Sequence, residues 1–256
     1  MSFLSRLFGR KPSSEDEKTP QMQKVPEWIG CDCTFLPGNI SGGEQMRLYL
    51  EEYEKGKTAG YTPVVVWIDK MLAELVEDAF HNIPDVAEYH NSMCALASDG
   101  GRTFLHQRFT EQMQCLQTDF EFREQLYGEY DDRLSPLDGF DDAKDGYPVL
   151  LRVPVTEPWN IFAWVPFGGW NECPADEDMM GVCRYWYEQY HAVPAVLSGD
   201  TLQMYCFAPV RDKDMALPLA EEQYGFCNDA VEQGAGTIKR LASRLIGSRV
   251  WYFWWD

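Results

Sequence analysis

The sequence predicts an α+β protein in which helices pack against a mixed or antiparallel sheet. Apolar residues recur at helical spacing in several segments, among them Gly42–Lys57 and Asp176–Tyr190. Short runs rich in β-branched or aromatic residues lie between such segments, as in Thr62–Ile68. The chain ends in Trp251–Asp256, where five consecutive aromatic residues are too few to span a bilayer but suit a pleated, apolar environment. Helices interleaved with strands define the α+β class, and we expect the aromatic end to form a strand buried in the core.

The first half of the folded chain is predicted to hold helices around one buried strand. The apolar face of Gly42–Lys57 predicts a helix, and the strand Thr62–Ile68 follows it. Pro63 stands at the start of that strand, where a missing N–H donor is tolerated. Helical spacing returns from Met71 to Phe80, and Phe104–Leu126 fits one long helix or two shorter ones.

The second half follows an acidic stretch, Glu129–Asp145, whose Pro and Gly residues predict a loop at a domain boundary. The patterns beyond this loop predict, in order, a strand over Trp159–Val165, a helix over Asp176–Tyr190, a hairpin of Val193–Leu197 and Leu202–Phe207, helices near Lys213–Asn228 and Gly236–Leu245, and the terminal strand. The hairpin assignment depends on Ser198–Thr201, which has the composition of a tight turn.

The N-terminus differs in character from the rest of the chain. In Met1–Lys11, apolar residues at helical spacing are combined with basic residues only, which predicts a short basic amphipathic leader. Pro12–Pro26 has the composition of a flexible linker. We therefore divide the chain into residues 1–27, 28–145 and 146–256, the last two being either separate domains or one continuous domain.

The charge balance restricts the partners. The chain has 41 acidic and 22 basic residues and a formal net charge of -19, so its field repels nucleic acid and anionic lipid and attracts a basic partner. No nucleic-acid partner is expected, and membrane contact is at most peripheral, through residues 1–11. The alternative is that the charge serves solubility alone.

The cysteines predict a reducing compartment. There are 8 of them in a chain without a secretory signal pattern, so we expect free thiols and a cytoplasmic location. Cys31 and Cys33 form a Cys-x-Cys pair, but no second pair with zinc-like spacing follows. The sequence therefore predicts no metal site and no cofactor.

Three segments carry a family resemblance. They are Gly168–Pro174 (GGWNECP), the segment that begins EEQYGFCND at Glu221, and the aromatic ending. Together they resemble the bacterial domain-of-unknown-function 4253 family. The resemblance implies a common fold and no particular activity.

The loop Gly168–Pro174 is the first candidate site, because paired glycines permit a tight turn next to several polar side chains. Cys173 is a candidate nucleophile if a histidine lies near it. Converging carboxylates are the other catalytic option, and the candidates are Glu172, Asp200, Glu221 and Asp229. The structural alternative is that Asn171 and Glu172 bond the turn itself while Trp170 fills the core.

Candidate binding residues lie on that loop and on two acidic segments. They are Trp170, Asn171, Glu172, Asp141, Asp142, Asp145 and Glu222. Three functions are compatible with these residues. The first is a non-enzymatic cytoplasmic protein-binding module, including the role of an immunity protein that neutralises a toxin. The second is an enzyme with a Cys or carboxylate site near Gly168–Pro174, and the third is a peripheral membrane adaptor.

Overall fold

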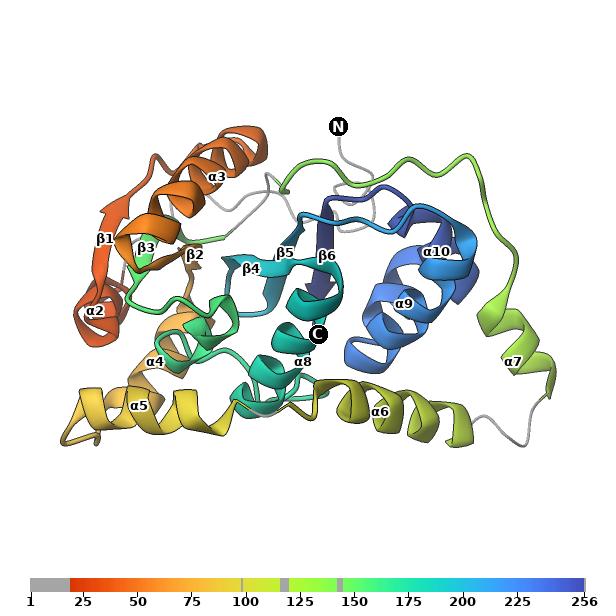
Figure 1. Cartoon of the computed structure of the whole chain (residues 1–256). Coiled ribbons are helices and arrows are strands. Elements are labelled where there is room, and N and C mark those ends of the chain that lie inside the picture. Colours follow the sequence, from red (N-terminus) through yellow and green to blue (C-terminus); the bar gives the residue numbers. More distant parts are fainter. Residues whose placement is uncertain (1–18, 98, 116–119, 142–144, 256) are drawn as a thin grey trace.

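The computed structural model describes residues 19–97, 99–115, 120–141 and 145–255. The predicted leader, Met1–Lys11, and the binding candidate Asp142 lie outside these ranges. The described residues form a mixed sheet with helices packed on it, which confirms the predicted α+β class (Figure 1). The strands follow the spatial order β1-β3-β2-β4-β5-β6. Their bounds are β1 Asp32–Phe35, β2 Thr62–Ile68, β3 Tyr147–Val153, β4 Ala192–Leu197, β5 Thr201–Cys206 and β6 Val250–Trp254.

The helices lie on both faces of this sheet (Figure 1). The α-helices are α2 Pro20–Ile29, α3 Gly42–Ala59, α4 Lys70–Phe80, α5 Val86–Leu96, α6 Gly101–Cys115, α7 Phe120–Tyr127, α8 Asp176–Tyr190, α9 Lys213–Phe226 and α10 Ile238–Leu245. A 3-10 helix, η1, spans Pro158–Ala163, and a π-helix, η2, spans Ala230–Ala235. Within the described ranges, none of the helices has the length and apolar composition needed to cross a membrane.

Strand pairing joins the two halves of the chain. Strands β2 and β4 pair in parallel, and every other pairing in the sheet is antiparallel. Strand β3 lies between β1 and β2, with Val65 opposite Leu150 and Val66 opposite Val149. Residues before and after position 145 therefore contribute to one hydrogen-bonded sheet.

The two faces of the sheet bury different sets of side chains. All seven residues of β2 are buried, as expected of a strand covered on both sides. Val64 and Val66 face the larger core, which is completed by α4, α8 and α9. Val65 and Trp67 face a smaller core together with Tyr49 of α3. Period-two alternation along a single strand thus supplies both cores.

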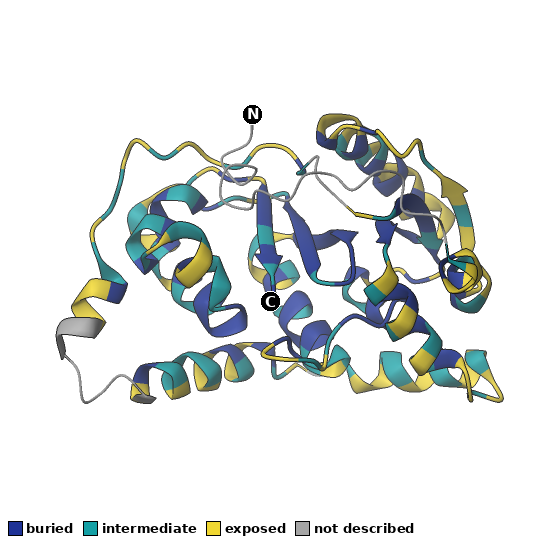
Figure 2. Cartoon of the chain, turned by 180° about the vertical axis from the view of Figure 1, so that it is seen from behind, coloured by how far each residue is buried: buried dark blue, intermediate teal, exposed yellow. Residues whose placement is uncertain are grey.

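The aromatic end of the chain is buried, as predicted (Figure 2). Trp251 and Trp255 are each 1% exposed and Phe253 is fully buried. The ring of Phe253 stacks on Trp186 of α8 at a centroid distance of 5.5 Å, and Phe226 meets Trp255 edge-on at 5.4 Å. Aromatic contacts of this kind add to the stabilisation from area burial. The last strand therefore joins the sheet to the helices α8 and α9.

Two sequence predictions were wrong. The segment predicted as a strand over Trp159–Val165 begins with the 3-10 helix η1, in which the amide of Trp164 donates to Ile161 O at 3.0 Å. Periodicity cannot distinguish a buried apolar helix from a buried strand over so short a run. The predicted linker also ends earlier than Pro26, because α2 begins at Pro20 and its N-cap Thr19 accepts a hydrogen bond from the amide of Met22. Helix α2 buries Met22, Val25 and Ile29 on one face.

Candidate functional site

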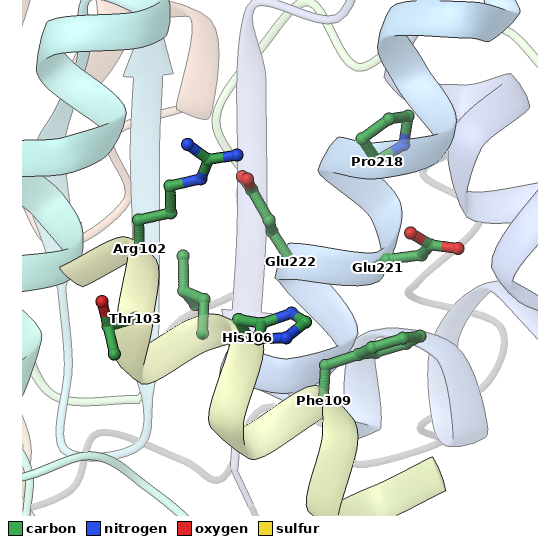
Figure 3. A pocket seen from close by; sticks show the side chains of 8 residues that line it. Arg102, Thr103, His106, Phe109, Pro218, Glu221 and Glu222 are labelled. Carbon is green, nitrogen blue, oxygen red and sulfur yellow. The ribbon is translucent and has the colours of Figure 1, made fainter.

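An open groove lies between α6 and α9, with a volume of about 560 Å³. Pockets of this size accommodate small ligands or single side chains of a partner. Figure 3 shows how the two helices supply the walls. The lining residues are Arg102, Thr103, Leu105, His106 and Phe109 from α6, and Pro218, Glu221 and Glu222 from α9.

Glycine at position 225 allows the two helices to approach at the base of the groove. A Cβ atom on Gly225 would lie 2.8 Å from the carbonyl oxygen of Leu105 and 3.0 Å from the amide nitrogen of Phe109. Contacts this short would force the helices apart. A glycine within the EEQYGFCND segment therefore sets the spacing of the two walls.

Two side chains of α8 hold the carboxylate of Glu222 in place. Tyr185 Oη donates to Glu222 Oε1 at 2.8 Å, and Trp186 Nε1 donates to Glu222 Oε2 at 3.0 Å. Desolvation raises the pKa of Glu222 above its usual value, while these two hydrogen bonds and the charge of Arg102 lower it in part. The result is a partly desolvated carboxylate with a fixed orientation.

Glu221 is fixed in the same manner from another side. Tyr127 Oη, at the end of α7, donates to Glu221 Oε1 at 2.6 Å. Desolvation, together with this bond, raises the pKa of Tyr127, so the phenol remains a donor at neutral pH. The two carboxylates of α9 are thus positioned by aromatic donors that belong to α7 and α8.

The opposite wall carries the positive charge of Arg102. Arg102 and His106 stand one helical turn apart on α6, and both are exposed. Figure 3 shows the Arg102 guanidinium and the Glu222 carboxylate turned toward each other. The groove therefore combines positive and negative walls with an apolar floor that includes Leu105, Phe109 and Pro218. Such a surface suits a charged side chain with an apolar stem.

The loop Gly168–Pro174 is a compact turn. A Cβ atom on Gly168 would lie 1.7 Å from Pro174 O, and the amide of Gly169 donates to the same oxygen at 3.0 Å. Trp170 Nε1 donates to Phe167 O at 3.0 Å, and Trp170 packs against the main core. Asn171 adopts a positive φ of 47° in this turn. These contacts give the paired glycines and the tryptophan a structural explanation.

The polar residues that follow in the loop have separate partners. Glu172 forms an ion pair with Arg108 of α6 at 2.8 Å. Cys173 is 5% exposed, and desolvation raises the pKa of its thiol well above the usual range. Asp176 Oδ1 accepts from the amides of Phe167 and Gly168 at 3.0 and 3.4 Å. Desolvation raises the pKa of Asp176 to about 6, although the two amide bonds oppose this shift.

The remaining carboxylate candidates lie in different local structures. Asp200 Oδ1 accepts from the hydroxyls of Ser198 and Thr201 at 3.0 and 2.9 Å, as expected in a tight turn. Asp229 Oδ1 accepts from Gln233 Nε2 at 2.8 Å. Each of the four carboxylates proposed for catalysis thus has its own set of partners. Across the residues that the structure describes, no group of three or more His, Cys, Asp or Glu side chains could hold a metal ion.

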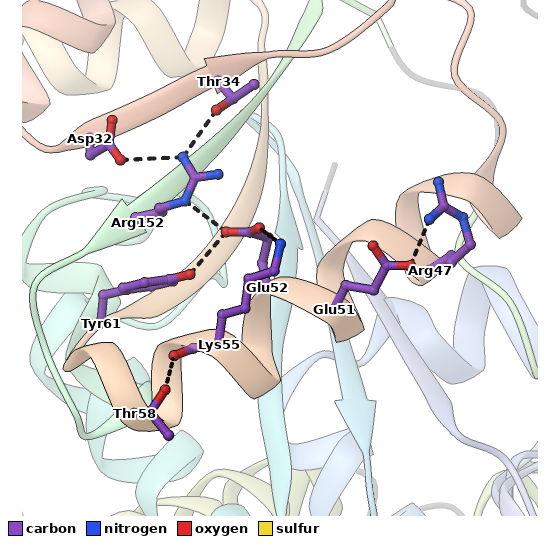
Figure 4. Close-up of polar contacts among 9 residues, drawn as sticks. All are labelled: Asp32, Thr34, Arg47, Glu51, Glu52, Lys55, Thr58, Tyr61 and Arg152. Atoms are coloured by element: carbon purple, nitrogen blue, oxygen red, sulfur yellow. Dashed lines mark hydrogen bonds and ion pairs between the residues drawn. The ribbon is translucent and has the colours of Figure 1, made fainter.

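A second polar cluster lies on the α3 face of the sheet (Figure 4). Arg152 of β3 donates through Nε to Glu52 Oε2 at 2.7 Å and through Nη1 to Thr34 Oγ1 of β1 at 3.0 Å. Glu52 also accepts from Lys55 Nζ at 2.7 Å and from Tyr61 Oη at 3.0 Å. Desolvation raises the pKa of Glu52, but these hydrogen bonds outweigh it and bring the pKa to about 2. The Glu52 carboxylate is occupied by groups of its own chain, so this cluster joins α3, β1 and β3.

Sequence reasoning identified one wall of the groove. Glu221 and Glu222 were candidates, whereas Arg102, His106 and Tyr127 were not. The spacing of Arg102 and His106 places them on one face of a helix, but nothing local to α6 shows that this face meets α9. Tyr127 lies 94 residues from its acceptor.

The C-terminal part of the chain matches a known family. Residues 149–256 match the model of the family described as Domain of unknown function (DUF4253). The predicted resemblance is therefore confirmed. A search of curated proteins and a search of solved structures found no match. The matched region includes α9 and the loop Gly168–Pro174 and leaves out α6, so only one wall of the groove lies within it.

Proposed function

We propose that this chain is a non-enzymatic protein-binding module, and that it receives a basic segment of its partner in the groove between α6 and α9. The observation that carries this proposal is the fixing of Glu221 and Glu222 at an open groove by donors from α7 and α8. Carboxylates that are oriented before binding lose little entropy when a cation arrives. The particular case that we propose within this class is an immunity protein that binds and neutralises a toxin with such a basic segment.

The charge of the chain supports this class of partner. A net charge of -19 attracts basic proteins at long range. The fixed carboxylates in the groove would then determine the position and orientation of the bound partner. The charges of Asp141 and Asp145, which are binding candidates from the sequence, would contribute to this attraction.

The chemistry of the cysteines favours binding over nucleophilic catalysis. Desolvation raises the pKa of the thiols of Cys31, Cys33, Cys94, Cys173, Cys183, Cys206 and Cys227. A catalytic thiol requires the opposite shift, since the thiolate is the nucleophile.

The proposal is tested by capture of the partner at low salt and by measurement of its binding rates. Raising the salt concentration should slow association more than it speeds dissociation, because steering acts through a field screened beyond about 8 Å at physiological ionic strength. Glu221→Gln should weaken the complex. Glu51→Gln is the matched control, because Glu51 is half-exposed and forms an ion pair with Arg47 of its own helix, away from the groove. Equal binding by both variants, or an association rate that ignores salt, would contradict the proposal.

A further inference from the structure

We propose that α5 is an acid-sensitive element: uptake of a proton by His90 detaches this helix from the body of the protein and exposes the aromatic rings on which it rests. These rings belong to Phe80 of α4 and to Trp164, which follows η1. The inference goes beyond the proposed function and does not depend on it.

Helix α5 is attached to the protein by one narrow stripe of side chains. The structure describes every residue of this helix, and His90, which is 7% exposed, is its one buried residue. The stripe is completed by half-buried residues at helical spacing that pack against the larger core, namely Val86, Tyr89, Met93 and Cys94. The contact of α5 with the body is therefore centred on an ionisable side chain.

The imidazole of His90 lies in an aromatic environment. Its ring stacks on Trp164 at a centroid distance of 4.0 Å and an interplanar angle of 26°, and it meets Phe80 edge-on at 5.7 Å. His90 Nε2 is buried and has no hydrogen-bond partner in the described structure. A neutral imidazole can leave this nitrogen without a proton, whereas an imidazolium carries an N–H on both ring nitrogens. Protonation therefore places a charge and an unpaired donor inside the contact.

The charged groups around His90 do not offset its burial. Tyr89 and Cys94 are its titratable neighbours on α5, and α4 contributes the uncharged ring of Phe80. Desolvation raises the pKa of Tyr89 and of Cys94, and the charges that add to these shifts are those of Glu157, Asp176 and Glu177. Desolvation lowers the pKa of His90 below its usual value of 6.5, and none of these charges opposes that shift. Stacking on Trp164 would attract an imidazolium, but this attraction is small beside the cost of burying a charge without a partner.

The elements next to α5 have anchors of their own. Helix α4 buries Leu72, Val76 and Phe80 in the larger core. At the start of α6, a Cβ atom on Gly101 would lie 2.1 Å from the carbonyl oxygen of Gly181, so this helix packs directly on the backbone of α8. Helix α5 itself lies at the margin of the molecule (Figure 1). It can therefore leave the body without displacing α4 or α6.

Proton binding sets the direction of the effect. A histidine whose pKa is lowered by folding stabilises the docked state fully above the pKa of the free side chain, and this stabilisation is lost as the pH falls below about 6.5. Helix α5 should thus be docked at neutral pH and increasingly released in acid. The open fraction should rise by no more than about tenfold per pH unit, the limit for uptake of one proton.

The experiment is hydrogen–deuterium exchange of the full chain at about pH 7 and about pH 5, followed by mass spectrometry and corrected for the pH dependence of intrinsic exchange. We expect the peptide that covers α5 to lose protection in acid, while peptides from α4 and α6 keep theirs. His90→Phe keeps an aromatic ring that cannot be protonated, so it should keep α5 protected at both pH values. His81→Gln is the matched control, because His81 is exposed at the end of α4, and it should behave like the wild type.

Two further measurements do not depend on how well His90→Phe folds. The ring resonances of His90 in the wild type should titrate with a pKa below 6.5. Asp176 has a pKa of about 6 and titrates in the same range, so Asp176→Asn should retain the acid release of α5. The proposal is overturned if α5 stays protected in acid, if α4 and α6 lose protection with it, or if His90→Phe loses protection like the wild type. A pKa of His90 at or above 6.5, or loss of the acid release in Asp176→Asn, would overturn it as well.

Discussion

Substitution of Glu52 by glutamine tests whether the cluster around Arg152 stabilises the fold through charge. Glutamine keeps the shape of the side chain and removes the negative charge that Arg152 and Lys55 contact. The pKa of Glu52 in the folded protein is about 2, compared with 4.5 for the unperturbed group. This difference corresponds to at most about 3.5 kcal/mol of stability, since one pKa unit is about 1.4 kcal/mol. Because Arg152 borders solvent, we expect a loss of about 2 kcal/mol at pH 7.

The stability difference between wild type and Glu52→Gln should depend on pH in a defined direction. A carboxyl whose pKa is lowered by folding contributes its full stabilisation above the pKa of the unfolded chain, and loses it as the pH falls from about 4.5 toward 2. The difference between wild type and Glu52→Gln should therefore be largest at pH 7 and should shrink at pH 3. Urea unfolding followed by tryptophan fluorescence measures both values.

A matched substitution separates this effect from the loss of any acidic residue on α3. Glu51 is half-exposed and pairs with Arg47 one turn away, so Glu51→Gln should change stability by less than about 0.5 kcal/mol. If Glu52→Gln destabilises the protein equally at pH 7 and pH 3, the loss reflects packing and the electrostatic account is refuted.

Four further predictions follow from the core and the motif loop. Removal of Val250–Asp256 deletes several buried aromatic side chains worth about 1.5 to 3 kcal/mol each, so the truncated chain should lack a cooperative melting transition. Folding raises the pKa of Asp176 to about 6, so the wild type should lose stability between pH 4 and pH 7 while Asp176→Asn should not, as compared by urea unfolding. Gly225→Ala should lower the melting temperature, because the new Cβ would lie 2.8 Å from Leu105 O. Cys173 should react with a thiol reagent only after denaturation, as shown by mass spectrometry of the modified peptide.

Strong local patterns predicted most of the fold. The helix Asp176–Tyr190 and the hairpin around Ser198–Thr201 were located correctly, because apolar periodicity and turn composition act within a few residues. Helix α5 and strand β1 were not predicted. Strand β1 has only one half-buried residue among exposed ones, so it lacks the alternation that identifies a strand. It pairs with β3, where Arg152 donates to Thr34 from 118 residues away in the chain.

Only the α9 wall of the groove was predictable from the sequence, because the other wall is brought there by contacts between distant segments. Glu221 and Glu222 stand out within a single segment of the sequence, but a groove requires a second wall, and tertiary packing alone brings α6 to α9. The loop Gly168–Pro174 illustrates the converse case. Its polar residues suggested chemistry, whereas its glycines and Trp170 are accounted for by the turn and the core.

The arrangement of the groove bears on what the family match implies for function. The matched region, residues 149–256, contains Glu221 and Glu222. It also contains Tyr185 and Trp186, the aromatic donors that orient Glu222. Arg102 and Phe109 lie before that region, on α6. This helix packs closely against α9 because Gly225 has no Cβ atom. Both carboxylates and the donors to Glu222 thus lie in the matched region, whereas Tyr127, the donor to Glu221, lies before it. If the groove binds a basic partner as we propose, substitutions in α6 should change the selectivity for that partner without disturbing the hydrogen bonds that hold the carboxylates.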